Sequence, residues 1–127
     1  MKDAIYGRKM MADISMLDME IIQETLDDGG PELLEEMKDM LDEEYAEQIE
    51  SLKQAAEQSD SATISEIAHK FKGECVSLGF TALSEKCEEI EIKGKNNDLS
   101  DIGSLLGQMK NIYEQSISEI KDFVSAA

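Results

Sequence analysis

Apolar residues recur every three or four positions along most of this chain, which is the pattern of amphipathic α-helices. The longest stripe, between residues 31 and 58, contains Leu34, Met37, Leu41, Tyr45, Ile49, Leu52 and Ala56. The next stripe contains Ile64, Ile67, Ala68, Phe71, Cys75 and Leu78. Because an α-helix turns once every 3.6 residues, each set predicts one apolar face along one helix.

Turn-forming residues separate the predicted helices. Residues 27–30, Asp-Asp-Gly-Gly, end a short first helix that we expect to begin near Ser15, which can cap it. Pro31 then suits the first turn of the next helix, and Gly79 and the polar residues 94–98 end two later ones. The predicted helices span about 15–27, 31–58, 61–79, 81–93 and 99–123.

Four long helices joined by short turns must pack as antiparallel neighbours. The pattern therefore predicts an all-α fold, an antiparallel up-down four-helix bundle with a short additional N-terminal helix. We assign residues 15–127 to this single domain. Residues 1–14 form an N-terminal extension with a local positive bias, and their pattern fits an extra helix and a frayed tail equally well.

Composition narrows the classes of partner. The chain has 127 residues and a formal net charge of −17, which argues against nucleic acid and against an anionic membrane surface. The first residues lack the apolar core and cleavage site of a signal peptide, so we expect no secretion signal, and no apolar run is long enough to span a bilayer. Cys75 and Cys87 fall on core stripes, so we expect reduced core cysteines in a cytoplasmic protein.

The single histidine, His69, carries the candidate chemistry. At 3.6 residues per turn it lies roughly 140° from the centre of its helix's apolar stripe, so the imidazole should face water. Gly73 lies one turn further on the same face, and Lys72 is within side-chain reach. The pattern describes an exposed nucleophile with a cation beside it and open space in front of it.

The segment around this histidine reads H-K-F-K-G-E-C-V-S-L-G-F from His69 to Phe80. It resembles the histidine-phosphotransfer (HPt) domain family of two-component phosphorelays, whose pattern is approximately H-x-L-K-G-x-[SA]-x-x-L-G followed by an apolar residue. Phe71 replaces the usual leucine and Cys75 the usual small residue, both on the core side. The resemblance extends over about residues 17–124, and the family's fold is the same four-helix bundle.

The resemblance implies a phosphorelay intermediate. His69 would accept a phosphoryl group from an aspartyl-phosphate receiver domain or a kinase and pass it to an aspartate of a response-regulator receiver domain. Lys72 would stabilise the phosphoryl charge, and Gly73 would give the receiver access. The partner receiver would supply Mg²⁺, so we expect no cofactor or metal on this chain. The sequence contains no obvious ATP-binding segment, so the chain is expected to be a phosphocarrier and not an autokinase. Members of the family are usually monomeric when free, so the resemblance also implies a monomer.

Further residues are weaker candidates for this role. We expect Glu66, Lys70, Val76 and Phe80 to contact the partner, although Phe80 could instead cover the turn after its helix. In some family members a polar and a basic residue corresponding to Glu91 and Lys95 lie near the histidine. For this pair, a solvated helix end is the favoured interpretation.

Two functions other than phosphotransfer would explain parts of the sequence. Residues 66–69 form an E-x-x-H sequence, which in helical bundles can bind iron or manganese, but that site needs a second such motif and inward-facing ligands. A docking adaptor that carries no phosphate would explain the acidic surface and Val76. It would not explain why His69, Lys72 and Gly73 occur together.

Overall fold

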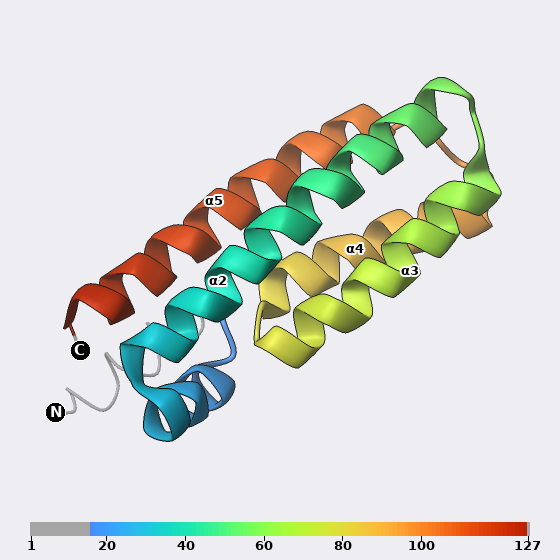
Figure 1. The fold of residues 1–127 in the computed structure, drawn as a ribbon. Coiled ribbons are helices and arrows are strands. Elements are labelled where there is room, and N and C mark those ends of the chain that lie inside the picture. The colour runs from blue at the N-terminus through green and yellow to red at the C-terminus, as the bar shows by residue number, and fades with distance from the viewer. Residues whose placement is uncertain (1–15, 127) are drawn as a thin grey trace, which may run out of the picture.

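The structure is a computed structural model that describes residues 16–126, and this part of the chain is helical without strands. Its four helices are α2 (Met19–Glu57), α3 (Ser61–Leu78), α4 (Thr81–Lys95) and α5 (Ile102–Ala126). They run up and down beside one another, with α5 along α2 and α4 along α3 (Figure 1). The predicted all-α bundle is confirmed, whereas the assignment of residues 1–14 lies outside the described residues.

The first helix bends sharply at Gly30, where φ is 73° and ψ is −171°. This conformation separates a short N-terminal arm from the long arm of α2, as Figure 1 shows. The predicted break after residues 27–30 is therefore present. The predicted start at Ser15 is wrong, because α2 begins at Met19 and Asp18 is its cap, its carboxylate accepting from the backbone N–H of Glu20 at 3.0 Å.

The core is a continuous apolar cluster to which every helix contributes. Leu34, Leu41 and Leu52 of α2 are fully buried, in agreement with the predicted stripe. The largest fully buried side chains of the other helices are Ile64, Phe71, Leu83, Ile90, Met109 and Ile120. The cysteines on the predicted stripes, Cys75 and Cys87, are buried and unbridged.

The turn between α3 and α4 is covered by the segment that precedes α2. Gly79, the C-cap of α3, has φ of 84°, and its carbonyl accepts from Asp18 N–H at 2.7 Å. Ala82 N–H donates to the carbonyl of Met16 at 3.1 Å. Phe80 is fully buried in this turn. Its predicted place on the partner-binding face is therefore corrected: its side chain belongs to the core.

Helices α3 and α4 approach closely at Gly94. A β-carbon there would lie 2.8 Å from the carbonyl oxygen of Ser61 and 2.9 Å from the backbone nitrogen of Ser65. Only a residue without a side chain permits this contact. Gly94 therefore sets the distance between the N-terminal part of α3 and the C-terminal part of α4, close to the candidate site.

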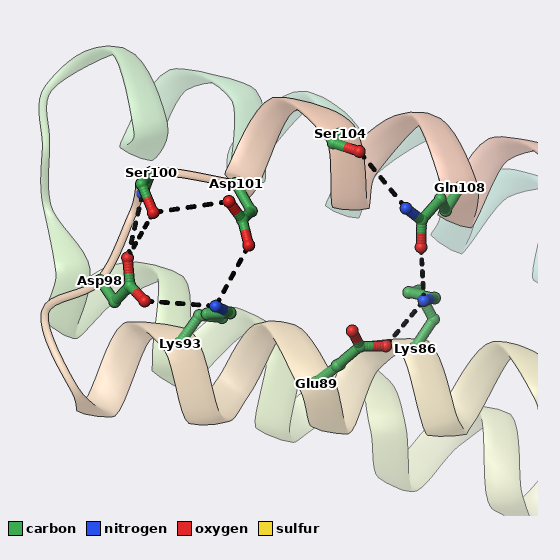
Figure 2. A network of polar contacts seen from close by, with 8 residues as sticks. All are labelled: Lys86, Glu89, Lys93, Asp98, Ser100, Asp101, Ser104 and Gln108. Carbon is green, nitrogen blue, oxygen red and sulfur yellow. Dashed lines mark hydrogen bonds and ion pairs between the residues drawn. The ribbon is translucent and has the colours of Figure 1, made fainter.

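A polar network joins α4 to α5 and to the turn between them (Figure 2). Lys93 of α4 binds Asp98 and Asp101, each at 3.2 Å, and Lys86 binds Gln108 of α5 at 2.7 Å. These contacts hold α5 against α4. None of the helices in residues 16–126 is long and apolar enough to cross a membrane.

Candidate phosphoacceptor site

His69 lies on the exposed face of α3, where 68% of its side chain is accessible to solvent. The helix exposes this ring because its apolar stripe, including Ala68 and Phe71, is buried on the opposite side. The prediction that the imidazole faces water is confirmed.

Glu91 of α4 brings the site together. The residue is only 4% exposed, yet its carboxylate reaches three nitrogen atoms. Oε2 lies 2.8 Å from His69 Nδ1 and 3.1 Å from Lys95 Nζ, and Oε1 lies 2.9 Å from Lys72 Nζ. One buried carboxylate therefore positions the histidine and both candidate lysines.

The ionisation of Glu91 decides which ring nitrogen is free. The Lys72 ammonium, and after it Lys95 and His69, lower the pKa of Glu91 to about 2, against the opposing effect of desolvation. The carboxylate is therefore ionised at neutral pH and can only accept hydrogen bonds. His69 Nδ1 must then be the donor. In the neutral imidazole this leaves the lone pair on Nε2, the nitrogen that does not contact Glu91.

The space in front of His69 is open. An added β-carbon at Gly73 would have no atom within 4 Å. Glu66 and Lys70 are exposed on the same helix, and Val76 is 54% exposed two turns beyond His69. The face therefore combines an exposed imidazole ring, a position without a side chain and an exposed apolar side chain, as the sequence predicted.

The interpretation of Glu91 and Lys95 as a solvated helix end is wrong for Glu91. Glu91 is buried, and the Lys95 side chain, although 64% exposed, is bound to it. The sequence offered one local signal, the spacing of four residues between this acid and this base on a helix. It could not show that the register of α4 against α3 places the pair beside His69.

A metal site, the alternative interpretation of the E-x-x-H sequence, would require several ligating side chains close together. Within residues 16–126, no group of three or more histidine, cysteine, aspartate or glutamate side chains could hold a metal ion. The carboxylate of Glu91 is bound to the nitrogen atoms of His69 and Lys72. Glu66, the acid of the E-x-x-H sequence, is exposed on the surface of α3.

Comparison with known proteins decides the family. Residues 32–119, more than half of the chain, match the family model described as "Hpt domain". The chain belongs to the Hpt domain family. Proteins of this family are phosphocarriers in two-component phosphorelays, where they interact with kinases and receiver domains. No curated protein matches the chain in the corresponding sequence search.

A solved structure supports the same assignment. The crystal structure of histidine-containing phosphotransfer protein B (HptB) from Pseudomonas aeruginosa PAO1 superposes with a TM-score of 0.72 at 26% sequence identity. The match covers 90% of this chain and 98% of that chain. The likeness therefore includes nearly the whole of both molecules.

Proposed function

We propose that this Hpt domain accepts a phosphoryl group on Nε2 of His69 from the aspartyl phosphate of a receiver domain, or from a kinase. It then transfers the group to an aspartate of a response-regulator receiver domain. The observation that carries the proposal is the hydrogen bond between His69 Nδ1 and the buried Glu91, which leaves Nε2 exposed as the nucleophile.

In the accepting step, the Nε2 lone pair attacks phosphorus and forms the N–P bond. The P–O bond to the donor aspartate breaks, and its electrons leave with the carboxylate. The ring then carries a positive charge shared with Nδ1–H, which Glu91 stabilises through a charge-assisted hydrogen bond. The reverse sequence, with a receiver aspartate attacking phosphorus, returns the ring to its neutral form.

Lys72 and Lys95 supply positive charge beside the transferring group. Each ammonium has three N–H donors, so a bond to Glu91 leaves others for phosphoryl oxygens. Phosphoryl transfer depends mainly on positioning and charge stabilisation, which is what a carboxylate that holds two lysines beside a histidine provides.

The remaining parts of the reaction belong to the partner. We propose that the receiver supplies the aspartate and the Mg²⁺, that this chain binds no cofactor, and that it acts as a cytoplasmic monomer without autokinase activity. Glu66, Lys70 and Val76, all exposed around the site, are proposed to contact the receiver. A transfer assay with a set of receiver domains would identify the receiver.

The test is transfer from a set of ³²P-phosphorylated receiver domains to wild type and to His69→Gln. We expect acid-labile label on wild type and none on the variant. Unchanged helicity by circular dichroism serves as the control, because the ring is exposed. Label on the variant would refute His69 as acceptor. A wild type that binds a receiver but takes no label from any donor would indicate a docking adaptor.

A further inference from the structure

A groove of about 530 Å³ lies between α2 and α5, away from His69. This volume falls within the range of roughly 300–1,000 Å³ that is usual for small-molecule sites. One wall is formed by Tyr45 and Tyr113, whose rings stack in parallel with their centroids 3.9 Å apart. Ile49 and Leu106 add aliphatic surface, so the groove is lined mostly by apolar groups.

Two glycines keep the groove open. Gly103 and Gly107 lie one turn apart on α5 and both line it, and a β-carbon at either position would have no atom within 4 Å. Glycine inside a helix is less favourable than alanine, which applies to Gly107, whereas Gly103 lies in the first turn of α5. No close helix contact or positive φ requires glycine at either position. At these positions the absence of side chains leaves room for another molecule.

Cations without partners line the same groove. Lys53 and Lys110 have no ion pair or hydrogen bond within residues 16–126. Five other lysines of the described residues are bound to carboxylates: Lys38, Lys72, Lys86, Lys93 and Lys95. Lys70 and Lys121 are also unpaired there, but neither lines the groove. In a chain with a net charge of −17, two unpaired lysines beside one apolar groove favour an anionic ligand.

A third charged side chain limits how much negative charge the ligand can carry. Glu114 also lines the groove, so the lining carries two positive charges and one negative charge. This balance favours a ligand with a single negative charge over a polyanion. The hydroxyl of Tyr45, a residue only 9% exposed, has no hydrogen-bond partner within the described residues and can donate to such a ligand.

We infer that this groove binds a small aromatic or branched acid with one negative charge, a carboxylate or a sulfonate. The apolar body of the ligand lies over Gly103 and Gly107 against the tyrosine pair, and its acid group meets Lys53 and Lys110. A partner helix fits less well, because the most exposed large apolar residues, Met40, Val76 and Ile92, do not line the groove.

The test uses 8-anilino-1-naphthalenesulfonate, an aromatic monosulfonate, as the probe. We expect saturable fluorescence enhancement with one site per chain. Gly107→Leu should weaken binding at least tenfold by filling the groove, and it should fold well because the new side chain enters open space in a helix. Lys53→Gln combined with Lys110→Gln should weaken binding several-fold.

Lys121→Gln is the matched control, since this lysine is also unpaired and on α5 but does not line the groove. It should leave probe affinity unchanged, as should His69→Gln, so the result is independent of phosphotransfer. In ¹H–¹⁵N spectra, probe-induced shifts should be confined to the groove. Wild-type affinity in Gly107→Leu, or shifts centred on Val76 and Ile92, would overturn the inference.

Discussion

The carboxylate of Glu91 contacts three nitrogen atoms, one each from His69, Lys72 and Lys95. Each contact has a separate consequence for the chemistry. The bond to Nδ1 makes Nε2 the free nitrogen of the neutral ring, and the bonds to the two ammonium groups keep positive charge beside it. A single substitution at this residue therefore tests the whole arrangement.

Glu91→Gln should lower the free energy of unfolding and make that free energy less dependent on pH. The pKa of Glu91 is about 2 in the folded protein and 4.5 for an unperturbed glutamate, so only the unfolded state takes up this proton between those values. The stabilisation is therefore full above pH 4.5 and is lost as pH falls toward 2. Because His69 and Lys95 are largely exposed, solvent screens part of this stabilisation. We therefore expect Glu91→Gln to lower the free energy of unfolding by about 1–2 kcal/mol at pH 7.

Urea unfolding of wild type and Glu91→Gln at pH 7 and at pH 3 measures this effect. The difference in free energy of unfolding should shrink at the lower pH. Glu88→Gln is the matched control, since Glu88 is 60% exposed on the same helix and 3.9 Å from Lys72. An equal loss of stability in both variants would contradict the special position of Glu91. Transfer to His69 should slow by at least about tenfold in Glu91→Gln only.

Gly73→Glu should block phosphotransfer without unfolding the domain. The new side chain would enter open space one turn from His69, where it crowds the approach of a receiver and repels the phosphoryl group. We expect a transfer rate at least about a hundredfold lower, since a small misplacement of the reacting groups can lower a rate by that factor. Gly103→Glu places the same charge in equally open space on α5 and should transfer normally. Normal transfer by Gly73→Glu would rule out close approach at this position.

The spacing of the helices matters as much as their side chains. Glu91 and Lys95 belong to α4 and His69 to α3, so their contacts depend on how closely these helices pack. Gly94, between the acid and the lysine in sequence, allows backbone contact with Ser61 and Ser65. The site is therefore assembled by a pair of helices, neither of which contains it alone.

Gly94→Ala should separate this pair. Its β-carbon would lie under 3.0 Å from backbone atoms of α3, which cannot rotate away as a side chain can. We expect a loss of about 1–3 kcal/mol in the free energy of unfolding, measured in urea, and slower transfer because Glu91 moves away from His69. Gly103→Ala, an alanine in open space on α5, should instead be neutral or stabilise by up to about 1 kcal/mol. Equal changes in the free energy of unfolding in the two variants would show that only helix propensity differs between glycine and alanine at these positions, which would contradict the close contact at Gly94.

The sequence predicted the presence of the helices well and their ends less well. The long stripes of α2 and α3 recur at helical spacing, so their existence and buried faces were predictable. The start of α2 was misplaced because both Ser15 and Asp18 are good caps, and only the folded chain uses Asp18. Phe80 was ambiguous for a related reason: its burial depends on the way residues 16–18 cover the α3–α4 turn.

Across the whole molecule, apolar side chains are exposed unevenly. The large ones that are most exposed in the described part of the chain are Met40, Val76 and Ile92. Val76 lies on the helix that carries His69, and Ile92 directly follows Glu91. Both therefore lie on the pair of helices that forms the site, whereas Met40 lies on α2.

Val76→Asp and Ile92→Asp should each weaken the productive complex with the receiver. We expect the receiver concentration for half-maximal transfer to rise by about tenfold, with little change in the rate at saturation, because exposed apolar residues beside the site would contribute to binding and not to chemistry. Met40→Asp, a substitution at a residue that is 59% exposed, is the matched control. If Met40→Asp weakens transfer and the other two do not, the receiver docks over α2.

The sequence by itself determined the helices, the acidic surface and the exposure of His69, because helical periodicity and charge are local properties of the chain. It also placed Lys72 and Gly73 beside the histidine, since both lie within one turn of the same helix. Only the tertiary structure decided that Glu91 and Lys95 join them. Contacts between helices depend on their register and distance, which here follow from the close approach at Gly94 and from the turn at Gly79, and no local pattern encodes these.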